Sequence, residues 1–213
     1  MDEFRLWRDH PLHILFVMAT EQEYGPALQG RIQPLITGVG PVEAASATSE
    51  ALARLDAEHD LPQLVFSLGS AGSRKLEHAK IYQLSSVCYR DMDCTPLGFE
   101  RGVVPFLGLP AVVNIPQQIP GIPSASIATG ASIVSGAMYD TIEADMVDME
   151  SYAVCRAAGR FGIPMIGLRG ITDGKTELSQ YEDWASYLGI VDRRLAIELD
   201  RFFAAVKDGT FSL

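Results

Sequence analysis

The 213-residue sequence has few cysteines, no long apolar run and no cluster of basic residues. Its cysteines, Cys88, Cys94 and Cys155, are odd in number and lack metal-type spacing, which is typical of reduced thiols in a cytoplasmic protein. The only early apolar run, 12–19, is far too short to span a membrane, and the leader before it lacks a signal-peptide layout. We therefore expect a cytoplasmic protein with no metal and no membrane partner.

The charge balance is acidic. Seventeen Lys and Arg stand against 27 Asp and Glu, giving a formal net charge of −10, which argues against a nucleic-acid partner. The hydrophobic share of 47% and the charged share of 21% are ordinary for a globular protein. A chain of this length can bury a substantial core, so we expect one domain over 1–213, in which 1–11 is a leader of unknown role.

Strand and helix patterns alternate along the chain. A helix with Pro41 at its favoured first position is predicted to end near residue 57, and a shorter one is expected to open at Thr20. A long helix over 181–206 carries an apolar stripe that predicts core or dimer packing: Trp184, Leu188, Val191, Leu195, Leu199 and Phe202. The short apolar or alternating segments that predict strands are 12–19, 32–36, 63–68, 81–89, 124–129 and 165–168.

The most informative stretch runs from 146 to 174. Met-Val-Asp-Met-Glu ends at Glu150, a helix follows over 151–161, and the next strand leads through Arg169 to Asp173. A strand, helix and strand in this order predict a right-handed crossover between parallel strands. Glu150 and Asp173 would then meet at the carboxyl edge of the sheet, where open α/β folds bind ligands.

This order of an acid, Met and Glu before a helix, then an Arg-containing strand ending in Thr-Asp, resembles the purine nucleoside phosphorylase and nucleosidase superfamily. It is most similar to the 5′-methylthioadenosine/S-adenosylhomocysteine nucleosidases. The resemblance covers residues 12 to about 206. It implies an α/β fold with three layers, α/β/α, around a central mixed sheet, and a small purine nucleoside as substrate. It also implies no cofactor, a homodimer, and a place in methionine salvage.

The resemblance assigns roles to the acids. Glu23 would activate the attacking water, Asp173 would protonate the departing base, and Glu150 would hold the ribose hydroxyls. Cleavage of an N-glycosidic bond develops charge on both sugar and base, so it needs such groups. The other substrate-binding residues that the resemblance suggests are Ser70, Ala71, Gly72, Cys94, Leu97, Ile133, Val134, Asp148, Met149, Arg169 and Thr172.

Each acid also has a purely structural interpretation. Thr20 and Glu23 fit a capping box at a helix start, Glu150 could be a helix-dipole partner, and Asp173 could form a turn. The joint pattern favours the catalytic interpretation.

Two positions favour water over phosphate as the nucleophile. Ser67 stands where similar phosphorylases carry a phosphate-binding arginine, and Ala-Thr-Glu-Gln-Glu replaces their Gly-Asp-Pro-x-Arg turn. The sequence therefore predicts hydrolysis of a purine nucleoside with an apolar 5′ group. The alternatives are a phosphate-dependent phosphorylase, a hydrolase of futalosine or adenosine, and a non-catalytic binding module.

The substrate pocket has two unusual features. Cys94 and Leu97 fall in a loop that, in the resembled nucleosidases, contributes an apolar 5′ pocket completed by a neighbouring subunit. Ile133 occupies the place of an aromatic ring that stacks on the base there, so stacking should be weaker. These positions favour 5′-methylthioadenosine over adenosine and disfavour AMP, because a buried phosphate would lack a partner.

Overall fold

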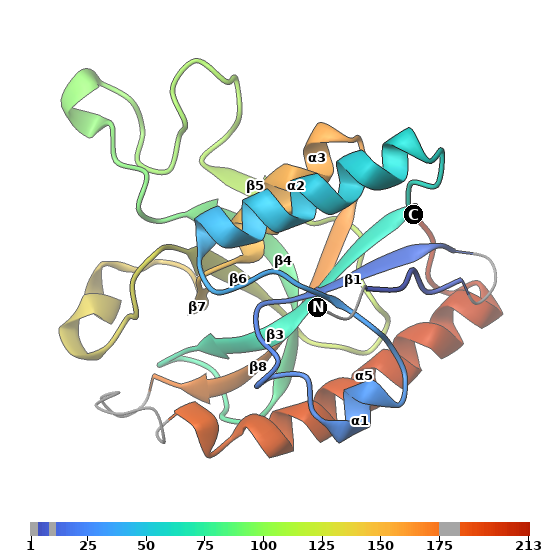
Figure 1. The fold of residues 1–213 in the computed structure, drawn as a ribbon. Helices are drawn as coiled ribbons and strands as arrows, with labels where there is room; N and C mark the ends of the chain where they lie inside the picture. Colours follow the sequence, from blue (N-terminus) through green and yellow to red (C-terminus); the bar gives the residue numbers. More distant parts are fainter. Residues whose placement is uncertain (1–3, 9–11, 175–183) are drawn as a thin grey trace.

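The computed structural model describes residues 4–8, 12–174 and 184–213. In these residues a mixed eight-stranded sheet lies between two layers of helices (Figure 1). The strands are β1 (Ile14–Met18), β2 (Leu35–Ile36), β3 (Leu64–Gly72), β4 (Ile81–Tyr89), β5 (Val112–Asn114), β6 (Ser124–Thr129), β7 (Met146–Asp148) and β8 (Met165–Asp173). The helices are α1 (Pro26–Gln29), α2 (Pro41–Ala57), α3 (Ser151–Arg160), α5 (Leu188–Asp208) and the 3₁₀ turns η1 (Thr95–Leu97) and η2 (Gly136–Thr141).

The strand order is β2-β1-β3-β7-β6-β4-β5, and β8 pairs with both β3 and β4. Strands β1 and β8 run parallel to β3, whereas β4 runs antiparallel to β8. The expected α/β fold with a central mixed sheet is therefore confirmed.

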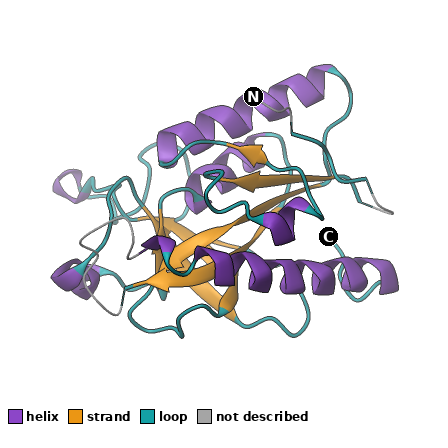
Figure 2. Ribbon diagram, turned by 60° about the horizontal axis from the view of Figure 1, so that its bottom comes forward, coloured by secondary structure: helices purple, strands orange, loops and turns teal. Residues whose placement is uncertain are grey.

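Helices α2 and α3 lie on one side of the sheet, and α1 and α5 lie on the other (Figures 1 and 2). Helix α2 begins at Pro41, as its sequence predicts. Most of the apolar stripe of α5 packs in the core, with Val191, Leu195, Leu199 and Phe202 buried. Phe202 meets Phe66 of β3 edge to face at 4.9 Å. Burial of each such side chain contributes about 1.5–3 kcal/mol.

The predicted helix at Thr20 is wrong. Residues 21–23 form a turn, and α1 starts only at Pro26. Pro26 could not lie inside a helix that began at Thr20, because its ring removes a backbone donor and clashes with the preceding turn. The side chain of Glu23 also leaves the local backbone and reaches Ser70, so no capping box forms.

The predicted parallel pairing around α3 is also wrong. Strand β7 pairs parallel with β6 and antiparallel with β3, whereas β8 is parallel to β3. Strand β7 has only three residues and pairs parallel with β6. It therefore runs opposite to β8, and the chain from β7 through α3 to β8 is not a crossover between parallel strands. Glu150 and Asp173 nevertheless face one cavity, which is described below.

The described part of the leader packs against the body. Trp7 exchanges backbone hydrogen bonds with Ile14, and its ring stacks on Phe203 of α5 at 4.5 Å. Among the described residues, no helix is both long and apolar enough to cross a membrane.

Candidate active site

A cavity of about 720 Å³ opens beside the end of β3, β7 and β8, within the size range of small-molecule sites. Its polar lining includes four acidic side chains, and its apolar lining comes from several separate segments. The lining residues are Ala19, Thr20, Gln22, Glu23, Val39, Ser70, Ala71, Gly72, Arg90, Ser132, Ile133, Val134, Val147, Asp148, Met149, Glu150, Asp173 and Trp184.

Glu23 ends a short chain of hydrogen bonds at one wall of the cavity. One of its carboxylate oxygens accepts from the Ser70 backbone N–H at 2.8 Å and from the Ser70 hydroxyl at 2.6 Å. That hydroxyl in turn accepts from the Trp184 indole N–H at 2.9 Å. Burial raises the pKa of Glu23, and the Ser70 hydrogen bonds partly offset the rise. Glu23 is thus a fixed carboxyl with increased basicity, as a general base requires.

The turn that carries Glu23 is anchored from a distant helix. Asp192 of α5 is buried, and its carboxylate accepts from the backbone N–H groups of Ala27 and Leu28 at 3.0 and 3.1 Å. These N–H groups open α1 and have no partner inside so short a helix. Asp192 therefore caps α1 and ties the segment just after Glu23 to α5.

A buried ion pair lies beneath the acids. Arg169 donates to Asp148 through two of its nitrogens, each at 3.2 Å, and both side chains are almost fully enclosed. The remaining Arg169 contacts are with Ser67 and Leu168 of the two paired strands and with the Ser151 hydroxyl. All three guanidinium nitrogens thus donate to protein atoms. Arg169 offsets the negative charge of the site, and Asp148 and Ser67 hold it in place.

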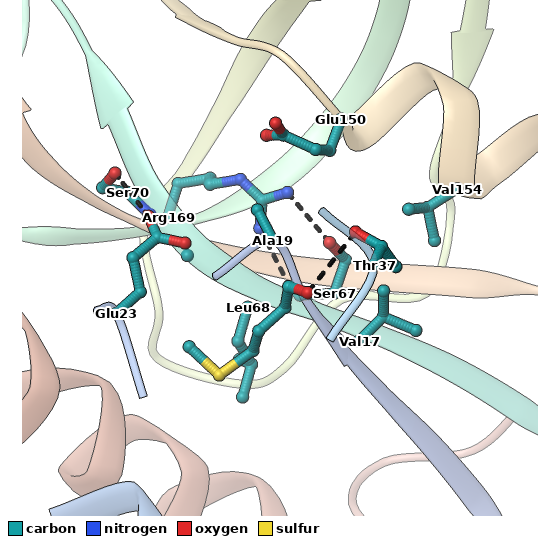
Figure 3. A pocket seen from close by; sticks show the side chains of 12 residues that line it. Val17, Ala19, Glu23, Thr37, Ser67, Leu68, Ser70, Glu150, Val154 and Arg169 are labelled. Carbon is teal, nitrogen blue, oxygen red and sulfur yellow. Dashed lines mark hydrogen bonds between the residues drawn. The ribbon is translucent and has the colours of Figure 1, made fainter. Parts of the chain in front are cut away.

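A second, much smaller cavity adjoins Glu23 and Arg169. Its volume of about 10 Å³ is close to what one water molecule needs. Figure 3 shows Glu23, Ser70, Arg169 and Glu150 around this space, with Thr37 and Ser67 beside them. The site can therefore hold a water between two carboxyl groups.

Glu150 sits between the two cavities at the start of α3. Its carboxylate accepts from the Gly40 backbone N–H at 2.8 Å. Burial, and next the charge of Asp148, raise the pKa of Glu150 to about 7, although the Gly40 hydrogen bond and Arg169 act in the opposite direction. Above about pH 7, Glu150 is mostly ionised and can accept hydrogen bonds from sugar hydroxyls.

Asp173 also lines the large cavity. It accepts from the Thr172 hydroxyl at 2.8 Å, and burial raises its pKa. Gly72 makes room for it: a Cβ there would collide with the Asp173 carboxylate and with the hydroxyl of Tyr139. A half-buried carboxyl with a raised pKa keeps its proton to higher pH, which suits a general acid.

The cavity brings together most of the predicted site residues. They are Glu23, Ser70, Ala71, Gly72, Ile133, Val134, Asp148, Met149, Glu150 and Asp173. Arg169 lies at the small adjoining cavity, and Thr172 is buried behind Asp173. Cys94 and Leu97 do not line the cavity of their own chain, and 77% of Leu97 is exposed.

Two lining residues, Trp184 and Arg90, are not among the predicted site residues. The apolar spacing places Trp184 in a packing stripe, but it lines the cavity and bonds Ser70. Arg90 directly follows β4, and only the pairing of β4 with β6 brings it beside Ser132. Both placements depend on contacts between segments that are far apart in the chain.

Comparison with known proteins gives the family. The family model described as the Phosphorylase superfamily matches residues 27–204. The chain belongs to this superfamily. It is 30% identical over 158 residues to a 5′-methylthioadenosine/S-adenosylhomocysteine nucleosidase of Haemophilus influenzae (strain PittEE). This alignment covers 66% of this chain and 67% of the relative. It is 28% identical over 186 residues to the nucleosidase of the same name from Hydrogenovibrio crunogenus, covering 78% of each.

Solved structures of other proteins share the fold. A futalosine hydrolase mutant of Helicobacter pylori aligns with a TM-score of 0.75 at 17% identity, over 90% of this chain and 98% of that one. A putative 5′-methylthioadenosine/S-adenosylhomocysteine nucleosidase from Borrelia burgdorferi, bound to adenine, aligns with a TM-score of 0.74 at 19% identity, over 90% and 99%.

The buried acids of this phosphorylase-superfamily site predict a pH-dependent stability. Glu150 binds its proton more tightly in the folded state, so its contribution to the free energy of unfolding falls as pH rises from about 4.5 to about 7. A shift of this size corresponds to about 3 kcal/mol. We expect Glu150→Gln to lessen that decline by a similar amount in urea unfolding at pH 4.5 and 8. The exposed Glu50→Gln is the control, and an unchanged decline in Glu150→Gln would contradict the assignment.

Proposed function

We propose that this protein hydrolyses the N-glycosidic bond of purine nucleosides with an apolar 5′ substituent, of the 5′-methylthioadenosine/S-adenosylhomocysteine type, and releases adenine. The observation that carries the proposal is the convergence of Glu23, Glu150 and Asp173 on one cavity. Three carboxyl groups with raised pKa values match the three needs of the reaction: an acid at the base, an acceptor at the sugar and a base for water. The names of the similar nucleosidases support the same reaction.

Asp173 acts as the general acid in this mechanism. Its proton passes to a ring nitrogen of the purine as the glycosidic bond breaks, so that the base leaves neutral. The raised pKa of Asp173 lets it keep its proton to a higher pH than an exposed aspartate does. Thr172 fixes one carboxylate oxygen and thereby the direction of the other.

Glu23 and Glu150 act on the sugar side. Glu23, held by Ser70, takes a proton from water as the water attacks the anomeric carbon. Glu150 accepts hydrogen bonds from the ribose hydroxyls, and Met149 packs against the sugar. The negative charges also stabilise the positive charge that develops on the sugar in the transition state.

Base release is expected to be independent of phosphate. Ser67 occupies the site of the missing phosphate arginine, and its hydroxyl is already engaged by Arg169 at 2.8 Å. Among the described residues, Arg90 is the only basic side chain in the large cavity's lining. The test is adenine release from 5′-methylthioadenosine in phosphate-free buffer and with added phosphate, with the sugar product identified by mass spectrometry. A strict phosphate requirement, with a ribose 1-phosphate product, would show a phosphorylase instead.

A second candidate substrate is futalosine, because the fold is also that of a futalosine hydrolase. A comparison of kcat/KM for 5′-methylthioadenosine, S-adenosylhomocysteine, adenosine, futalosine and AMP separates these substrates. The exposed Ile133 in place of a stacking aromatic leaves room for more than one base.

The functional unit is proposed to be a homodimer. The segment between β4 and β5 extends away from the body (Figure 1) and carries exposed Leu97, Phe106 and Leu107, of which Phe106 is 94% exposed. An apolar surface of this kind is typical of a protein interface. Cys94 and Leu97 would then reach the 5′ end of the cavity of a second copy.

Light scattering at low micromolar concentration should give twice the monomer mass. Phe106→Asp should weaken the dimer, because it places a charge in the buried interface. Ile197→Asp, on the exposed side of α5, serves as the matched control. A fully active wild-type monomer would contradict the proposal.

The cellular setting is also a proposal. Cys88, Cys94 and Cys155 are free thiols, which suits the cytoplasm. A role in methionine salvage follows if 5′-methylthioadenosine is the substrate.

A further inference from the structure

Arg90 is a buried cation that the proposed mechanism does not use. It directly follows β4 and lines the large cavity, and only 13% of its side chain is exposed. It is the only cation in the described lining, where the other charged side chains are carboxylates, which cannot donate a hydrogen bond to an acceptor on a ligand. Arg90 is therefore the one positively charged donor among the lining residues that the structure describes.

The guanidinium of Arg90 has a donor to spare. Of its five N–H groups, one bonds Asp91 at 3.0 Å, one bonds the Ser132 hydroxyl at 3.1 Å and one bonds the Ser132 carbonyl oxygen. Nε is shielded from solvent and has no hydrogen-bond partner. One N–H group, on Nη2, thus remains for an acceptor in the cavity, whereas Nε is enclosed by the protein. An occupant that supplies an acceptor to Nη2 would complete the hydrogen bonding of that nitrogen.

The protein holds this guanidinium firmly in position. Ser132 and Asp91 accept hydrogen bonds from its Nη atoms. Gly130 packs against it so closely that a Cβ at Gly130 would lie 2.5 Å from Cζ and 2.7 Å from Nε. A larger residue at Gly130 would displace Arg90. A guanidinium fixed in this way needs little reorganisation to bind a ligand, which favours tight recognition.

We propose that Arg90 is a specificity-determining residue that binds a planar oxygen acceptor of the nucleoside. Such an oxygen has two sources: the carbonyl of an oxopurine base, or a carboxylate on the 5′ substituent. Arg90 adjoins Ser132, next to Ile133 and Val134, so either group must reach that wall. 5′-Methylthioadenosine carries neither oxygen. The inference rests on the proposed hydrolysis of a purine nucleoside. The carboxylate source selects S-adenosylhomocysteine among the proposed substrates, whereas the carbonyl source changes the released base from adenine to an oxopurine.

Three substrates separate the two sources. 5′-Methylthioinosine adds the base carbonyl to 5′-methylthioadenosine, and S-adenosylhomocysteine adds the carboxylate. We expect wild-type kcat/KM for one of them to exceed that for 5′-methylthioadenosine, and Arg90→Met to lower this ratio about tenfold or more. Arg90→Lys should retain part of the preference, since it keeps the charge and loses the fork. The exposed Arg194→Met is the matched control and should keep the wild-type ratio.

A loss of activity that the substitution causes for all substrates does not change the ratio of two kcat/KM values, because both values are measured on the same variant. Two results would overturn the role of Arg90. In the first, Arg90→Met keeps both kcat/KM ratios, for 5′-methylthioinosine and for S-adenosylhomocysteine relative to 5′-methylthioadenosine, within about twofold of wild type. In the second, wild type prefers 5′-methylthioadenosine to both other substrates. If wild type releases no base from any of the three, the nucleosidase function itself fails. Calorimetric dissociation constants of adenine, hypoxanthine and S-adenosylhomocysteine then test Arg90 separately: equal preferences in wild type and Arg90→Met would refute it.

Discussion

Asp173→Asn will lower turnover by about 10² to 10⁴, the usual worth of a general acid. Asn keeps the size of the side chain and its hydrogen bond to Thr172, but it has no proton to transfer to the departing base. Substrate binding should change much less, because Asp173 acts mainly on charge that develops in the transition state. Steady-state kinetics should therefore show the loss in kcat, with KM nearly unchanged.

The control for Asp173 is Asp140→Asn, which removes a carboxylate that is 67% exposed and paired with Arg74. That variant should keep wild-type turnover. Asp173→Asn also has to retain the wild-type circular dichroism and melting temperature. A folded Asp173→Asn enzyme with near wild-type kcat would show that another group protonates the base.

Glu23→Gln will lower turnover by a similar factor of about 10² to 10⁴. Gln can still accept from Ser70 through its amide oxygen, so the hydrogen-bond chain to Trp184 should survive. It cannot take the proton of the attacking water, and the barrier rises accordingly. Because burial raises the pKa of Glu23, wild-type activity should also fall as pH drops through that pKa and protonates the base.

Glu21→Gln is the matched control for Glu23, since it lies in the same turn with an exposed side chain. Its activity and pH profile should equal those of wild type. If Glu23→Gln retained both turnover and the acid limb of the profile, the water would have to be activated elsewhere, for instance by Glu150 across the small cavity.

Local patterns predicted the elements that depend on local forces. Strands β4 and β6 and helix α2 begin and end where apolar alternation, Pro41 and flanking turns place them. The positions of Glu23, Glu150 and Asp173 were predicted from the order of the motifs along the chain, and the fold brings all three to one cavity. The helix at Thr20 failed because Pro26 and the long-range contact of Glu23 with Ser70 outweigh the capping pattern.

Other features depend on tertiary contacts that a single sequence does not display. The direction of β7 is set by its pairing with β6, and Trp184 reaches Ser70 from 114 residues away. Likewise, sequence could predict that Arg169 lies near the acids, but not that all of its nitrogens donate to protein atoms.

The pairing of β3 with β8 joins Ser67 to Gly167, about a hundred residues apart along the chain. Contacts at such separation slow folding, because a long loop must close before they form. Most of the chain must therefore leave the ribosome before Ser70 and Asp173 can meet, and α5 must follow to secure the turn of Glu23 through Asp192. Nascent chains that end before β8 should expose the apolar edge of β3 and rely on chaperones until synthesis is complete.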